Sequence, residues 1–221
     1  RDAAIKKNSP LTVVNGFPEG PLDVLPLRGE HQKRNAALAL AVVNFLQKQI
    51  PVSAQQIQEG LMDVRWPGRL QLVEQAGGRK LLLDGAHNIA GARAVCEALE
   101  TNFSAANPAL VLGILQDKDW PEICRVLAPL ARVIVAVPVS NSRTADPEDL
   151  AGACRAANPS ANVSVCRSLG QALEKTAAEK FIIVCGSLYL IGEALELLGK
   201  ISSAKGEREL NEWSGGEALK S

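Results

Sequence analysis

The stretch KLLLDGAHNIAGARAVCEALE, residues 80–100, places an apolar strand-like run directly before a helix-like pattern. KLLLD (80–84) is apolar at every interior position, which is typical of a strand covered on both faces. The residues from about 88 to 101 then have the pattern of a helix. A strand followed by a helix in this way is the repeating unit of sheets built from parallel strands.

The same alternation continues through most of the chain. Further strand-like runs are LQLVE (70–74), ALVLGIL (109–115), RVIVAVPV (132–139), NVSVC (162–166) and FIIVCGS (181–187), and helix-like stretches occupy about 119–130, 146–157, 168–179 and 187–199. We therefore predict an α/β fold with a mainly parallel six-stranded sheet, covered by helices on both faces. Because Gly77-Gly78 joins the first two runs, we expect these two to form a hairpin.

The first part of the chain has a different texture. Its first 30 residues contain several Pro and Gly and the apolar runs LTVV and LDVLPL, which predict short strands and turns. HQKRNAALALAVVNFLQKQ (31–49) predicts a largely buried helix, which Pro51 ends. Ser53 has the character of an N-cap for a second helix, AQQIQEGLMDV.

WPGR (66–69) is a hinge-like break between these helices and the α/β pattern. We therefore expect two regions, residues 1–65 and residues 66–200. Residues 201–221 have little apolar content, so we expect a disordered tail there.

Composition excludes several classes of protein. The 221 residues carry 24 Lys+Arg and 24 Asp+Glu, so there is no basic excess to neutralise nucleic-acid phosphates. No apolar run reaches the ~18 residues of a membrane span. Five cysteines without a CxxC pair favour reduced thiols in a cytoplasmic protein, and two histidines exclude a multi-histidine metal centre. The chain begins at Arg1 without an initiator Met or a leader, so we expect a fragment of a longer gene product.

Polar residues follow four of the predicted strands, at 84–88, 116–119, 140–144 and 186–187, where ligands bind in parallel sheets. The turn Asp84-Gly85-Ala86-His87-Asn88 combines a carboxylate, an imidazole and an amide, and its glycine lets a ligand approach the backbone. This turn would hold ribose hydroxyls, an amine or an anion; the alternative is a simple helix cap with a surface histidine. Gly186-Ser187 would suit a carboxylate or phosphate, although an ordinary N-cap serine is the simpler interpretation.

Four more polar residues are weaker candidates on their own. Arg69 follows a Pro-Gly turn and would bind phosphate at the junction of the two regions, or it is a solvated or ion-paired arginine. Asn35 is merely a polar residue in the first turn of a helix. Asp117 and Asp119 would form an acid–base pair, but Asp119 before Trp-Pro-Glu is more typical of a helix start. The sequence contains no Walker phosphate loop, no GxGxxG and no GxSxG.

Four motifs together carry a family resemblance. GEHQKRNAALAL (29–40), WPGRLQ (66–71), LLLDGAHN (81–88) and CGSLYLIGEAL (185–195) occur in an order and spacing that resembles the folylpolyglutamate synthase/dihydrofolate synthase family of the Mur ligase superfamily. The resemblance implies that residues 1–65 are the end of a central ATPase domain and that residues 66–200 are a Rossmann-like Mur ligase C-terminal domain. The family's phosphate loop, Mg²⁺ ligands and carbamylated lysine would lie upstream, so no metal ligand is expected in this chain.

The chemistry that the resemblance implies is ATP-dependent amide formation. The family adds L-glutamate to folates or to dihydropteroate through an acyl phosphate. By position, Asn35, Arg69 and Asp84 would contact ATP, and His87 and Ser187 would lie near glutamate and the acyl phosphate, with Arg69 and His87 as the catalytic residues. The family usually has Pro where this chain has Ile89, which alters helix entry more than chemistry.

The same sequence leaves two other functions open: a non-catalytic nucleotide-binding or interaction module, and another Mur-type amino-acid ligase. For the ligase, the partners implied are ATP, L-glutamate, folate or dihydropteroate and the missing ATPase domain, with no nucleic acid and no membrane. We expect a cytoplasmic monomer that is inactive without the upstream half.

Overall fold

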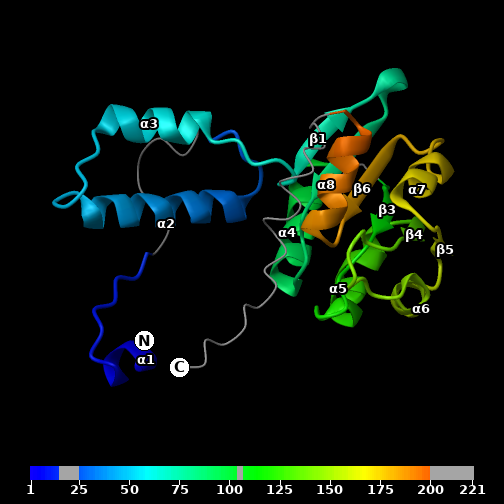
Figure 1. The fold of residues 1–221 in the computed structure, drawn as a ribbon, viewed down its shortest axis with the longest axis horizontal. Helices are drawn as coiled ribbons and strands as arrows, with labels where there is room; N and C mark the ends of the chain where they lie inside the picture. Colours follow the sequence, from blue (N-terminus) through cyan, green and yellow to red (C-terminus); the bar gives the residue numbers. More distant parts are fainter. Residues whose placement is uncertain (15–24, 104–106, 200–221) are drawn as a thin grey trace, which may run out of the picture.

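The computed structural model describes residues 1–14, 25–103 and 107–199 (Figure 1). The predicted tail at 201–221 and the beginning of the run LDVLPL lie outside these described residues.

The centre of the molecule is the predicted six-stranded sheet, with strand order β1-β2-β6-β3-β4-β5. The strands are β1 (Gln71–Glu74), β2 (Lys80–Asp84), β3 (Ala109–Leu112), β4 (Val133–Ala136), β5 (Asn162–Val165) and β6 (Phe181–Cys185). All neighbouring pairs are parallel except β1 and β2, which form the expected antiparallel hairpin. The predicted fold class is therefore confirmed. In this register Asp84 lies opposite Cys185, so the ends of β2 and β6 meet at one edge of the sheet.

Helices cover both faces of the sheet, as predicted (Figure 1). They are α4 (Ile89–Asn102), α5 (Trp120–Leu127), α6 (Pro147–Ala157), α7 (Leu169–Lys175) and α8 (Leu188–Leu197). Alternate residues of each strand point to opposite faces. Leu82 and Ile183 pack with α4, α5 and α6, whereas Leu83 and Val184 pack with α7 and α8. Continuous apolar strands are needed because both faces are buried.

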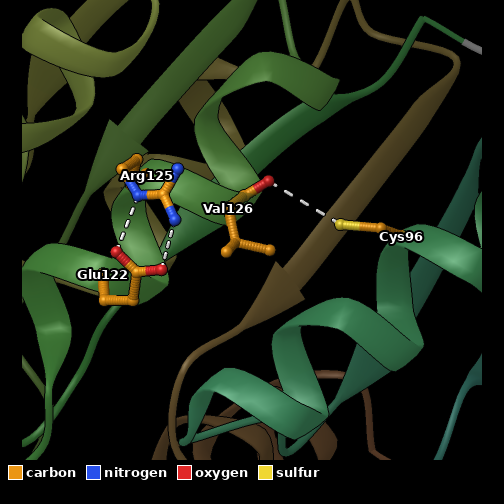
Figure 2. A network of polar contacts seen from close by, with 4 residues as sticks. All are labelled: Cys96, Glu122, Arg125 and Val126. Carbon is orange, nitrogen blue, oxygen red and sulfur yellow. Dashed lines mark hydrogen bonds and ion pairs between the residues drawn. The ribbon is translucent and has the colours of Figure 1, made fainter.

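The helices begin where short polar side chains cap them. Asn88, Ser168 and Ser187 each accept a hydrogen bond from a backbone N–H in the first turn of the helix that follows. Polar contacts then join neighbouring helices: the Cys96 thiol of α4 donates to the Val126 carbonyl of α5 at 3.7 Å (Figure 2). All five cysteines are free, and burial raises the pKa of the Cys96 thiol, which fits an inert structural role.

Two helices, α2 (Glu30–Leu46) and α3 (Ala54–Asp63), precede the sheet and lie side by side (Figure 1). We refer to them as the helical hairpin. Ala36 and Ala37 of α2 pack against Leu61 of α3 and form a small core of their own. Ser53 caps α3 in a full capping box with Gln56, as its N-cap character predicts.

Two expectations for this first region are wrong. The run LTVV at 11–14 forms no strand, and its Leu11 is 53% exposed, because none of the described strands lies beside it to supply hydrogen-bond partners. A helix, α1 (Asp2–Lys6), stands before it, with an acidic residue in its first turn and a basic one in its last. The helix predicted as largely buried is α2, yet its Leu38 and Phe45 are 56% and 71% exposed.

The turn between β6 and α8 depends on a glycine. Gly186 has φ +114°, and a Cβ atom there would lie 2.4 Å from the backbone oxygen of Gly113. We expect Gly186→Ala to lower the free energy of unfolding by at least about 2 kcal/mol, because the strained φ and the clash with main chain act together. Urea denaturation measures this change.

Gly192→Ala is the matched control, since Gly192 lies inside α8 and a Cβ there meets nothing within 4 Å. We expect this control to be unchanged or up to about 1 kcal/mol more stable. Equal stability of the two variants would contradict the role assigned to Gly186.

Candidate functional site

A cavity of about 780 Å³ lies between the helical hairpin and the end of β2. Asn35 from α2, Arg69 from the segment that joins hairpin and sheet, Asp84 at the end of β2 and His87 from the following turn all line it. Four of the five site residues predicted from the sequence are thus brought together around one space. Asn35 lies in the second turn of its helix rather than the first, because α2 begins at Glu30.

Asp84 fastens the joining segment, residues 66–70, to the sheet; we call this segment the hinge. Its carboxylate accepts hydrogen bonds from the backbone N–H groups of Leu70 and Ala86, each at 2.8 Å. Asp84 is buried, with only 4% of its surface exposed. The Gly85 N–H adds a bond to the Gly68 carbonyl at 2.9 Å. Burial raises the pKa of Asp84 above its usual value, against the opposing effect of these N–H donors and of the Arg69 guanidinium.

Arg69 brings a positive charge to this cavity. One of its terminal nitrogens lies 3.5 Å from the place where a Cβ on Gly85 would stand, so the guanidinium sits beside the Asp84–Asn88 turn. In the described part of the chain, no carboxylate lies within ion-pair distance of it. An arginine in this position has its donors available for an anion such as phosphate.

His87 presents one ring nitrogen to a ligand. Its Nδ1 lies 2.7 Å from the Gly85 carbonyl oxygen, which can only accept, so the proton of a neutral ring is on Nδ1. Nε2 is left for other partners. Asn88 caps α4 through the Gly91 N–H at 2.8 Å, and the first turn of α4 also lines the cavity. The turn is therefore a helix cap, as the simpler interpretation proposed, and a wall of the cavity as well.

Ser187 does not line this cavity. It is 2% exposed, and its hydroxyl oxygen accepts from the Tyr189 N–H at 3.2 Å as the N-cap of α8. The ordinary-cap interpretation of Ser187 therefore describes what its side chain does here. Its chain position is still close to the site, because the adjoining Leu188 side chain would meet a Cβ on Gly85 at 2.2 Å.

Sequence reasoning missed three residues that line the same cavity: His31, Gln32 and Trp66. His31 stands four residues before Asn35 and Gln32 stands three before it, so helical spacing alone places them on one face. Burial lowers the pKa of the His31 imidazole, while the charge of Asp84 acts in the opposite direction.

The two aspartates considered as an acid–base pair do not line this cavity. Asp117 pairs with Lys118 and Arg143, and Asp119 stands at the start of α5 without a capping hydrogen bond from its side chain. Asp119 is therefore the residue at which α5 starts, as expected, but its side chain does not cap the helix.

Within residues 1–14, 25–103 and 107–199, no three His, Cys, Asp or Glu side chains gather in a way that would hold a metal ion. None of the helices in these ranges is both long and apolar enough to cross a membrane. The upstream position of Mg²⁺ ligands, the cytoplasmic location and the monomeric state stay predictions.

Asp84→Asn tests the fastening of the hinge. An amide has one acceptor oxygen, so its NH₂ group would face a backbone N–H, and we expect unfolding to become easier by about 1–3 kcal/mol. Urea denaturation at neutral pH measures the change. Asp119→Asn is the control, because Asp119 is exposed and makes no capping bond. If both variants unfold at the same urea concentration, Asp84 does not hold the hinge.

Comparison with known proteins matches this architecture to one family. Residues 68–188 match the model of the Mur ligase, glutamate ligase domain. The dihydrofolate synthase/folylpolyglutamate synthase of Mycobacterium tuberculosis is 32% identical over 202 residues, which cover 80% of this chain and 40% of that protein. The Bacillus subtilis protein of the same name is 28% identical over 169 residues, 76% of this chain and 39% of that protein.

A crystal structure of the Mycobacterium tuberculosis folylpolyglutamate synthase complexed with ADP and AMPPCP superimposes with a TM-score of 0.70 at 31% identity, and covers 80% of this chain and 42% of that one. The chain therefore spans about two fifths of the length of these relatives. Because the matched family domain takes up more than half of the 221 residues and includes the hinge arginine and the Asp84–Asn88 turn, the chain belongs to the Mur ligase family, with residues 68–188 as its glutamate ligase domain.

Proposed function

We propose that this chain is the C-terminal part of an ATP-dependent ligase that joins L-glutamate to folates, to dihydropteroate, or to both. The observation that carries the proposal is the single cavity that Asn35, Arg69, Asp84 and His87 line together. The curated relatives named above are folate ligases, and one solved relative is described in complex with ADP and AMPPCP.

The proposed reaction has two steps. A carboxylate oxygen of the folate substrate attacks the γ-phosphorus of ATP, the bond to ADP breaks, and an acyl phosphate forms. The amine of L-glutamate then attacks the acyl carbon, the C–O bond to phosphate breaks, and the amine loses a proton. Both steps spread negative charge over phosphate oxygens, so positioning and electrostatic stabilisation supply most of the rate.

Arg69 is suited to stabilise that charge. Its guanidinium faces the cavity without a carboxylate partner among the described residues, so binding phosphate costs no existing ion pair. The fastening of Leu70 to Asp84 restricts the backbone beside it, which limits the freedom lost when the side chain binds. We assign Arg69 to the γ-phosphate and the acyl phosphate.

We assign Asn35 and Asp84 to the nucleotide and His87 to the incoming glutamate or the acyl phosphate. The Nε2 atom of His87 accepts from an ammonium group when neutral and donates to a carboxylate when protonated. We expect it to orient the amino acid rather than to transfer protons. Ser187 keeps a hydroxyl hydrogen to donate, but it is 2% exposed and does not line the cavity, so its neighbours must rearrange before glutamate can reach it.

The described residues offer no ligand set for Mg²⁺, so we assign no step to a metal in this part of the protein. We place the metal ligands, like the phosphate loop, in the upstream half of the proposed enzyme. The exposed face of α2 supports such a half: Leu38, Val42 and Phe45 are 56%, 50% and 71% exposed and follow helical spacing along one side. We propose that the helical hairpin is the end of an ATPase domain that covers this face.

Arg69→Ala tests the assignment in the protein as its gene encodes it. We expect kcat/KM for ligation to fall at least about tenfold, or ~1.4 kcal/mol of transition-state stabilisation. The assay follows glutamate-dependent ADP release with dihydropteroate and tetrahydrofolate in parallel. Arg65→Ala is the control, because the exposed Arg65 guanidinium donates to the backbone carbonyls of Met62 and Val64. Wild-type kinetics in the Arg69 variant would remove this residue from the site.

The 221-residue chain by itself should fold its α/β region but show no ATP turnover, because we place the phosphate loop upstream. Circular dichroism checks folding and ADP release checks turnover. Steady release that depends on folate and glutamate would overturn the division of the site between two halves. If the gene-encoded protein binds ATP but ligates neither substrate, a nucleotide-binding module is the better description.

A further inference from the structure

Three side chains on one face of α2 form a continuous hydrogen-bonded chain beside the cavity. The Asn35 side-chain Nδ2 donates to Gln32 Oε1 at 3.2 Å, and Gln32 Nε2 lies 3.0 Å from His31 Nε2. Gln32 is 8% exposed, although α2 as a whole exposes much of its surface. A buried amide that joins two neighbours in this way fixes both of them.

The direction of this chain determines what Asn35 offers to a ligand. An amide oxygen only accepts and an amide nitrogen only donates. Since Gln32 Oε1 accepts from Asn35, Gln32 Nε2 must donate, and His31 Nε2 must be the unprotonated acceptor. One hydrogen of the Asn35 NH₂ group is then bound to Gln32, which fixes the orientation of the amide and leaves its Oδ1 for the cavity that Asn35 lines.

The surroundings of Asn35 suit a flat ring. Ala39, Leu61, Val64 and Trp66 line the cavity on the side of the helical hairpin, whereas Arg69 and the Asp84–Asn88 turn line it on the side of the sheet. Apolar walls favour a base, and the cation favours phosphate. Adenine carries an amino donor at the position where guanine has a carbonyl oxygen.

We propose that Gln32 is a positioning residue, which holds Asn35 with Oδ1 toward the cavity and so selects the base that has an amino donor, rather than a carbonyl oxygen, at the position facing Oδ1: adenine over guanine. This inference rests on the proposed nucleotide site. It assigns to Gln32 a specificity role that acts through Asn35 and not through contact with the ligand.

Protonation of His31 reverses the chain of hydrogen bonds. A protonated ring donates from Nε2, so Gln32 turns its oxygen toward His31 and its NH₂ group toward Asn35, which then presents its own NH₂ group to the ligand. Burial, the largest influence, lowers the pKa of His31 below the usual 6.5; Arg69 and Arg34 act in the same direction, and Asp84 and Glu97 oppose them. The preference for adenine therefore weakens as the pH falls through the pKa of His31.

The test measures ATP and GTP affinity by calorimetry in the protein as its gene encodes it, with thermal unfolding as the folding check. Gln32→Met keeps the size of the side chain and removes its hydrogen bonds. We expect the ratio of ATP to GTP affinity to fall about fivefold to tenfold. Gln32→Glu still accepts from Asn35, so it should retain the wild-type ratio and lose the pH dependence.

Gln55→Leu is the matched control, because Gln55 is an exposed glutamine of α3 that bonds only to Glu59. Its ratio should equal that of the wild type. An unchanged ratio in Gln32→Met, or equal loss of both nucleotides, overturns the role of Gln32 and leaves the proposed ligase intact. If the Met variant does not fold, the wild-type protein supplies the test. A ratio of ATP to GTP affinity that stays constant from neutral pH down through the pKa of His31 then overturns the role of Gln32. A wild-type protein that binds neither nucleotide overturns this inference and the proposed function together.

Discussion

The carboxylate of Asp84 holds the site together. It accepts a hydrogen bond from one backbone N–H of the hinge and from one of its own turn, each at 2.8 Å. Asp84 itself is only 4% exposed to solvent. Burial of a charge is costly unless such donors surround it, and here the donors belong to the main chain and cannot rotate away. The same bonds place the residue after Arg69 against the sheet, so the position of the cation follows from the folding of β2.

The rest of the site is positioned by the parallel sheet, because the carboxyl ends of its parallel strands lie on the same side. β2 and β6 are neighbours with Asp84 opposite Cys185, so their two following turns come together. Their close approach needs Gly85, because a Cβ there would meet Leu188 after β6; a Cβ on Gly186 would instead meet the Gly113 backbone, which follows β3. The helical hairpin then closes the other side of the cavity with Asn35 and its neighbours.

The sequence predicts the sheet and its helices well, because buried parallel strands must be continuously apolar and each capped helix begins at a short polar residue. It predicts less of the first region. The run expected as a strand at 11–14 pairs with none of the described strands. One side of α2 is exposed although its composition suits burial, since composition does not say what packs against a helix. At the site, residue types and the family resemblance propose Arg69, Asp84 and His87 as candidates, and the structure places them around one cavity, but the chain through Gln32 depends on side-chain direction. Only atomic geometry resolves it.

The hydrogen bonds that hold the hinge to the sheet also determine whether Arg69 belongs to the sheet or to the helical hairpin, the two bodies that border the cavity. Because Leu70 and Gly68 are bonded to the Asp84–Ala86 turn, any swing of α2 and α3 must take place before residue 68, around the stretch that links α3 to Pro67. Arg69 therefore moves as part of the sheet, while Asn35 moves with the helices. Opening of the two bodies would draw Asn35 away from Arg69, so a nucleotide bound as proposed above would lose its contact with one of these two residues.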